Sequence, residues 1–149
     1  VDLVRNDLSR VAEKATVEVT DLCSIYSLET VHQMVSTIEC SISPEKGLSD
    51  ILRATFPMGS MTGAPKISAM KHIDQLELEG RGVYSGSLGY ISPTGDFDLN
   101  VLIRSLFHNS ISKVLMSNVG GAITSLSDPE QEYQECQLKA NAIFKTVNY

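Results

Sequence analysis

Apolar residues follow helical spacing in four segments of the chain. Residues 1–14 carry apolar side chains at positions 1, 3, 4, 8 and 11, which is the spacing of one helix face. Helical patterns return in residues 43–56, where Ser43 and Pro44 fit an N-cap and a first turn, and in residues 64–78. A last helix is predicted from Asp128 or Pro129 to about Val147, capped by Ser127 or Asp128.

Strand-like alternation occupies the segments between these helices. It predicts strands in residues 15–28 and 30–42, and again in residues 82–92, 97–107 and 112–124. The last three are separated by short turn-forming segments, so consecutive strands should pair as antiparallel hairpins. We therefore expect an α+β fold of antiparallel β-sheets flanked by helices, forming one domain over residues 1–149.

Charge and composition narrow the class of partner. Hydrophobic residues make up 42% of the chain and charged residues 20%, which is ordinary for a globular protein. The net charge of −6 makes the surface a poor general partner for nucleic acid or an anionic membrane. A small anionic substrate would therefore need a local cationic pocket or a metal ion.

The cysteines indicate the cellular compartment of the protein, and the first residues indicate whether the chain is part of a longer domain. The three cysteines, Cys23, Cys40 and Cys136, lack metal-ligand spacing, and an odd number argues against a complete disulfide framework. The odd cysteine count favours a reducing setting, so we expect a cytoplasmic protein. No apolar run reaches 18 residues, and no signal peptide is visible at the start. The chain opens at Val1 in the middle of a helical pattern, so we expect an N-terminal portion of a longer domain to precede it.

A loop of small residues from Gly59 to Lys66 is the first candidate site. Ser60 and Thr62 offer hydroxyl groups, and the loop leads into a helix whose free N–H groups favour anions. Composition alone fits a plain helix-capping loop better than a ligand site.

The last helix supplies the second candidate. Glu132, Glu135 and Lys139 share one helical face, because they are three, four and seven residues apart. Two carboxylates there could hold Mg²⁺, which prefers oxygen ligands and shares them with substrate and water. The simpler interpretation is a solvated helix with a Glu135–Lys139 ion pair.

Arg104 and the Gly120–Gly121 pair stand in predicted strands. Arg104 should share a strand face with Leu102 and Leu106, where a cation needs either a structural carboxylate or an anionic ligand. Paired glycines at the end of a strand indicate a close approach by another group, or simply a turn.

His32 and Tyr84 are single residues with ordinary interpretations. On the pattern alone, His32 is more simply a structural histidine on a strand, and Tyr84 a core aromatic with a satisfied hydroxyl.

Six ordered segments resemble the C-terminal part of the chorismate-utilising enzymes, and together they cover nearly the whole chain. They are VDLVRNDLSRV, VHQMVSTI, FPMGSMTGAPKISAMKHIDQLE, RGVYSGSLGYISPTGDFDLNVLIRS, NVGGAI and SDPEQEYQECQLKA. The family includes the first components of anthranilate synthase and aminodeoxychorismate synthase, and the isochorismate and salicylate synthases.

The resemblance implies roles for the candidate residues around chorismate, which carries two carboxylates. It implies that Glu132 and Glu135 hold Mg²⁺, and that the ring carboxylate of the substrate sits on this metal. It implies that the other carboxylate, that of the enolpyruvyl group, is held by three residues, which are Tyr84, Arg104 and the backbone N–H of Gly120.

The resemblance also implies which residues act on the substrate. His32 should lie near the substrate ring, the loop with Ser60 and Thr62 should lie against the substrate, and Lys139 should follow the metal ligands. We expect His32, Ser60 and Lys139 to be catalytic and Thr62 to bind substrate.

The loop sequence FP-x-GS-x-TGAPK looks most like the aminodeoxychorismate synthases. The expected reaction is the Mg²⁺-dependent amination of chorismate to 4-amino-4-deoxychorismate for folate (para-aminobenzoate) synthesis. A glutamine amidotransferase partner would supply the ammonia.

In this branch the resemblance implies an upstream lysine in a P-I-K-G-T motif. The chain lacks that motif, so we expect these residues to hold half a site and to have little or no activity alone. The alternatives are the anthranilate synthase branch and a non-catalytic binding domain of the same fold.

Overall fold

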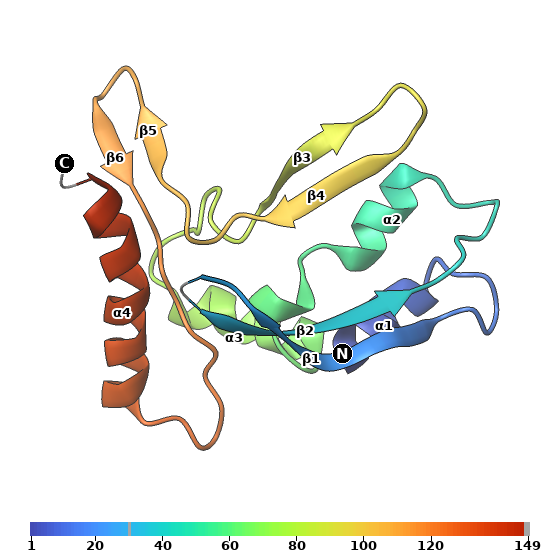
Figure 1. Ribbon diagram of the computed structural model, residues 1–149, viewed down its shortest axis with the longest axis horizontal. Coiled ribbons are helices and arrows are strands. Elements are labelled where there is room, and N and C mark those ends of the chain that lie inside the picture. The colour runs from blue at the N-terminus through green and yellow to red at the C-terminus, as the bar shows by residue number, and fades with distance from the viewer. Residues whose placement is uncertain (30, 148–149) are drawn as a thin grey trace. The chain divides into compact units, whose positions relative to one another are not determined.

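The computed structural model describes residues 1–29 and 31–147 of the chain. They form two compact units, Val1–Glu79 and Gly80–Tyr149. The α+β class with antiparallel sheets is confirmed, because helices accompany three two-stranded antiparallel sheets (Figure 1).

The unit Val1–Glu79 begins with helix α1, Asp2–Ser9, and a long hairpin. Strand β1, Glu18–Ser27, pairs antiparallel with β2, His32–Glu39, in a register that runs from Glu18 opposite Glu39 to Ser27 opposite His32. The two strands predicted before residue 43 are thus confirmed, apart from Thr30, which lies outside the described residues.

Helix α2, Leu48–Thr55, begins later than the sequence predicts. The expected cap at Ser43 is wrong, because Ser43 closes a separate turn in which the Lys46 N–H donates to its carbonyl oxygen at 2.9 Å. The helix is capped instead by Asp50, whose carboxylate accepts the Gly47 N–H at 3.0 Å. A carboxylate in the first turn also favours the positive end of the helix.

The small-residue loop connects α2 to α3, Lys66–Leu76. A short 3₁₀ turn, η1, occupies Gly59–Met61. The helix predicted in residues 64–78 is confirmed as α3, which begins two residues later than expected and buries none of its residues.

Two short hairpins open the unit Gly80–Tyr149 (Figure 1). Strand β3, Ser87–Ile91, pairs with β4, Phe97–Val101, and β5, Phe107–Asn109, pairs with β6, Val114–Met116. The predicted hairpins are confirmed, but the strands are shorter than predicted. The predicted strand 97–107 is divided between β4 and β5, and Gly120 and Gly121 lie beyond β6 in an irregular segment.

Helix α4, Pro129–Val147, closes the unit and agrees with the prediction. Asp128 caps it, because its Oδ1 accepts the Gln131 N–H at 3.0 Å, and Glu130 and Glu132 stand in the first turn. Local signals suffice here: a capping carboxylate, a proline in the first turn and acidic residues at the positive end.

Little apolar surface is fully buried in the described part of the chain. Its buried hydrophobic residues are Val11, Ala54 and Ile143, and its buried charged residue is Asp7. Within the same described residues, no helix is both long and apolar enough to cross a membrane.

Candidate functional site

The face of α4 that carries Glu132, Glu135 and Lys139 forms the centre of the candidate site. The Lys139 Nζ lies 2.5 Å from Glu135 Oε1. Both side chains are partly exposed, so solvent screens the pair and its contribution to stability is small. Glu132 is fixed differently, because its Oε1 accepts the Ser127 hydroxyl at 2.6 Å while its Oε2 is turned toward Gly121.

The irregular segment before α4 lies directly against this face. Lys139 Nζ donates to the Gly120 carbonyl oxygen at 2.9 Å. A Cβ placed on Gly121 would lie 3.1 Å from Glu132 Oε2, 3.9 Å from Glu135 Oε1 and 4.0 Å from Lys139 Nζ. Two carboxylates and an ammonium group therefore converge on the space that the missing side chain of Gly121 leaves open.

Tyr84 reaches the same segment from a turn that precedes β3. A Cβ placed on Gly120 would lie only 2.8 Å from the Tyr84 Oη, so any larger residue there would displace the Tyr84 hydroxyl. The turn is tied to the neighbouring strand segment, because the Ser85 N–H donates to the Leu102 carbonyl at 2.9 Å. Tyr84 thus stands next to Gly120, whose carbonyl Lys139 contacts.

Arg104 occupies a bend between β4 and β5, and the prediction that it shares a strand face with Leu102 and Leu106 is wrong. Regular pairing ends after Leu102, whose N–H donates to the Gly86 carbonyl at 2.9 Å. Arg104 then adopts φ of +50°, a left-handed conformation that breaks the alternation of a strand.

The bend places Arg104 on the wall of a cavity that Lys139 also lines. The cavity has a volume of about 300 Å³, and its remaining lining residues are Leu106, Ala142, Ile143 and Thr146. Of the two cationic lining residues, Lys139 is paired with Glu135, so Arg104 is the cation that suits an organic anion here. Arg104 and the part of α4 from Lys139 to Thr146 therefore line one pocket.

The donor set can be tested against Mg²⁺. Over residues 1–29 and 31–147, no group of three or more His, Cys, Asp or Glu side chains could hold a metal ion. Mg²⁺, however, is commonly bound by one or two carboxylates and completes its shell with water and substrate oxygens. Glu132 and Glu135, converging beside Gly121, fit that pattern rather than a closed protein cage.

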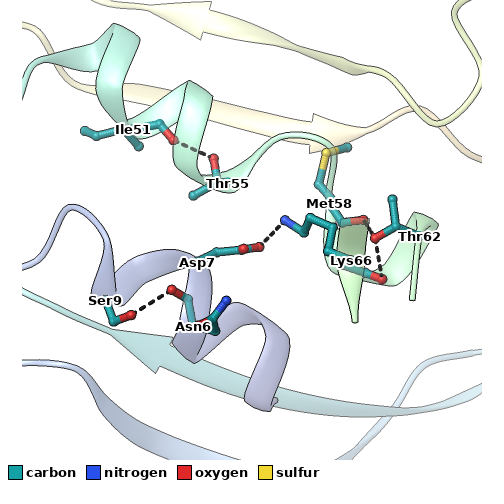
Figure 2. A network of polar contacts seen from close by, with 9 residues as sticks. Asn6, Asp7, Ser9, Ile51, Thr55, Met58, Thr62 and Lys66 are labelled. Atoms are coloured by element: carbon teal, nitrogen blue, oxygen red, sulfur yellow. Dashed lines mark hydrogen bonds and ion pairs between the residues drawn. The ribbon is translucent and has the colours of Figure 1, made fainter. Parts of the chain in front are cut away.

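His32, Ser60 and Thr62 belong to the unit Val1–Glu79. His32 is exposed on β2, with Nδ1 at 3.0 Å from the Ser27 hydroxyl. Ser60 is exposed in η1. The Thr62 hydroxyl bonds within its own loop, to the carbonyls of Met58 at 3.1 Å and Gly59 at 3.3 Å (Figure 2). The Thr62 hydroxyl thus shapes the loop, while Ser60 remains accessible.

Three structural features were not foreseen from the sequence. The Ser127 hydroxyl orients Glu132 in addition to its expected place near the cap. The cavity continues along α4 at Ala142, Ile143 and Thr146, and the recurrence of three and four residues from Lys139 could have revealed this face. A third feature, an ion pair between Asp7 and Lys66, joins segments 59 residues apart.

The chain is similar to known proteins over nearly its whole length. Residues 1–145 match the family described as chorismate binding enzyme. The chain is 47% identical to the chloroplastic aminodeoxychorismate synthase of Arabidopsis thaliana over 143 residues, which is 95% of this chain and 15% of that protein. It is 43% identical to aminodeoxychorismate synthase component 1 of Escherichia coli K12 over 147 residues, which is 99% of this chain and 32% of that protein.

The fold is also similar to that of a solved structure. The crystal structure of anthranilate synthase component I from Streptococcus pneumoniae TIGR4 superposes with a TM-score of 0.79 and 40% identity, over 93% of this chain and 32% of that one. The chain thus spans a third or less of the length of these relatives. The family match covers residues 1–145, and the chain belongs to the chorismate binding enzymes.

Proposed function

We propose that the chain forms part of an enzyme that aminates chorismate to 4-amino-4-deoxychorismate, the step that leads to para-aminobenzoate and folate. The proposal is supported by the curated relatives named aminodeoxychorismate synthase, at 43–47% identity. The proposal carries the activity in the names of those relatives over to a chain that spans only part of their length.

The convergence of charged groups beside Gly120 and Gly121 carries the proposal. Chorismate has two carboxylates, and a net charge of −6 makes most of the surface unfavourable for it. The cavity lined by Arg104 and Lys139 offers two cationic side chains, of which Lys139 is already paired with Glu135. The forked donors of Arg104 suit one carboxylate, and the Tyr84 hydroxyl beside Gly120 offers a further donor.

Glu132 and Glu135 are the residues that would hold Mg²⁺ in this proposal. The metal, when bound, would neutralise and polarise the second carboxylate of the substrate. Ser127 holds Glu132 in place, and the Glu135–Lys139 pair fixes the opposite edge of the same space. These groups bind and orient the substrate, a contribution that can lower a barrier by several kcal/mol.

The remaining proposed roles complete the reaction. His32 is proposed to lie near the substrate ring and Ser60 to face the substrate from its loop. Ammonia would come from a glutamine amidotransferase subunit or domain, and the enzyme would work in the cytoplasm. The plant relative is named as chloroplastic.

The anthranilate synthase branch is the second candidate function. It is favoured by the 40% identity and close superposition of the Streptococcus pneumoniae structure. The two branches act on the same substrate and differ in the product.

Product analysis tests the proposal. The enzyme that contains this sequence is supplied with chorismate, Mg²⁺ and ammonia, and the products are separated by liquid chromatography. We expect 4-amino-4-deoxychorismate. Anthranilate as the sole product would instead establish the second candidate, and the absence of any chorismate turnover or binding would leave the non-catalytic alternative.

A pair of variants on α4 tests the metal ligands. Glu135→Gln removes one carboxylate of the converging pair and should abolish Mg²⁺-dependent turnover without loss of fold. Glu130→Gln is the matched control, because Glu130 lies on the same helix but bonds only the Gln134 side chain, at 3.0 Å, among the contacts described for the chain. Turnover at the original rate in the Glu135 variant would remove Glu135 from the metal site.

A further inference from the structure

An ion pair in the unit Val1–Glu79 plays no part in the chemistry proposed above. The Lys66 Nζ lies 2.5 Å from Asp7 Oδ2, and only 14% and 6% of the two side chains are exposed (Figure 2). Lys66 is the first residue of α3, where the positive end of the helix disfavours a cation. The pairing with a buried carboxylate accounts for a lysine at this position.

A second contact joins the same two segments. A Cβ placed on Gly59 would lie 3.0 Å from the Leu3 Cβ and 3.2 Å from the Leu3 Cδ1, so the start of the loop packs directly on α1. Leu3 and Asp7 are four residues apart on α1 and therefore share one helix face. Residues 59 and 66 thus both rest on that face.

Between these two contacts the loop is held by its own bonds. The Thr62 hydroxyl donates to the carbonyls of Met58 and Gly59, and the Met61 N–H donates to the Met58 carbonyl at 3.0 Å (Figure 2). Ser60 stands exposed at the tip of this turn. A compact turn fixed at both ends holds the backbone of Ser60 in one defined position.

We propose that α1 is a positioning element for the loop Gly59–Lys66, with the Asp7–Lys66 ion pair as its main anchor. Asp7 and Lys66 are positioning residues that act through the loop and hold Ser60 where a ligand can meet it. The anchoring itself is independent of the reaction, whereas its consequence for Ser60 rests on the proposed function.

Hydrogen exchange measured by mass spectrometry tests the anchoring without any assay of activity. The double variant Asp7→Asn/Lys66→Gln removes both charges, so neither is left buried and unpaired. Amides of residues 59–63 should exchange about tenfold faster, while those of α4 should be unchanged. Arg5→Gln, which removes the exposed Arg5–Asp2 pair on the same helix, is the control and should leave the loop at its original rate.

Two outcomes would overturn the anchoring. One is unchanged exchange in residues 59–63 of the double variant, and the other is an equal increase in every part of the chain, which would indicate a general role in stability. Should the double variant fail to fold, Gly59→Ala disturbs the contact with Leu3 and leaves the ion pair in place. Faster exchange of the loop is then expected, and an unchanged rate would contradict the proposal.

Kinetics separate the consequence for Ser60 from the anchoring. At a temperature where all variants are fully folded, the double variant should have a kcat for chorismate at least tenfold below that of the wild type. The single variant Lys66→Arg, which keeps a cation opposite Asp7, should retain most of the wild-type kcat. At that temperature a purely structural role would leave kcat unchanged. If the wild-type enzyme does not turn over chorismate, the proposed function fails while the exchange experiment still decides the anchoring.

Discussion

Replacing Gly121 with alanine should weaken Mg²⁺ binding without weakening the fold. The new methyl group would lie 3.1 Å from Glu132 Oε2 and 3.9 Å from Glu135 Oε1, in the space where the two carboxylates converge. Mg²⁺ keeps several of its waters, so it needs that space for more than the ion itself. Changes next to metal ligands commonly lower affinity by about 10–100-fold, and we expect a loss of at least about tenfold, or about 1.4 kcal/mol.

Stability should change in the opposite direction. The backbone of Gly121 is not left-handed, so alanine fits its conformation. Replacing glycine by alanine at such a position stabilises a protein by about 0.4–1 kcal/mol, because the unfolded chain loses freedom. The crowding of Glu132 Oε2 offsets part of this gain, so we expect a melting temperature that is equal or slightly higher.

Calorimetric titration with Mg²⁺, together with thermal unfolding, measures both quantities on the enzyme that contains this sequence. Gly80→Ala is the matched control, because a Cβ at Gly80 would meet no atom within 4 Å, and it should leave Mg²⁺ affinity unchanged. Unaltered affinity in the Gly121 variant would refute the reasoning, since the metal would then not occupy the space between the carboxylates. A parallel fall in stability and affinity would instead indicate that the methyl group disrupts the fold.

The other predictions concern close contacts and titrating groups. Gly120→Ala should raise KM for chorismate at least tenfold, because its Cβ would lie 2.8 Å from the Tyr84 Oη. Adding Tyr84→Phe should restore the melting temperature but not KM. Recovery of both quantities would contradict a binding role for the Tyr84 hydroxyl. Burial raises the pKa of the Cys40 thiol, so alkylation by iodoacetamide near neutral pH should be slower in the folded chain than in urea, and equal rates would contradict this. The hydrogen bond to Asp98 raises the pKa of Tyr90, so Asp98→Asn should lower the midpoint of its absorbance titration. The stability linked to Tyr90 is present below about pH 10 and is lost as pH rises through the raised pKa. A titration midpoint that Asp98→Asn leaves unchanged would contradict Asp98 as the cause of the raised pKa.

The sequence predicted those elements whose signals lie within a few residues. Helix α4 was placed to its first turn, because Asp128 and Pro129 are adjacent and the cap acts locally. The β3–β4 hairpin followed from two alternating segments around one turn. The face shared by Glu132, Glu135 and Lys139 followed from helical spacing alone.

The errors arise where the backbone departs from what the local pattern indicates. The alternation around Arg104 continues in the sequence, but the backbone turns left-handed there, and no neighbouring residue signals the change. At residues 43–48 the Ser-Pro pair begins a separate turn, and the helix begins at the capping contact between Gly47 and Asp50. Tyr84 meets Gly120, and Asp7 meets Lys66, across long stretches of sequence, so neither contact could be derived from spacing.

The arrangement of the charged groups on one helix has a consequence for chain length. An α-helix turns by about 100° per residue, so a single insertion or deletion between Glu132 and Lys139 would carry the ammonium group well away from the carboxylates. The neighbouring irregular segment from residue 117 to 128 has no such constraint, apart from the glycines and Ser127. Natural variants of this protein should therefore differ in length before α4 or after it, and hold the number of residues between Glu132 and Lys139 constant.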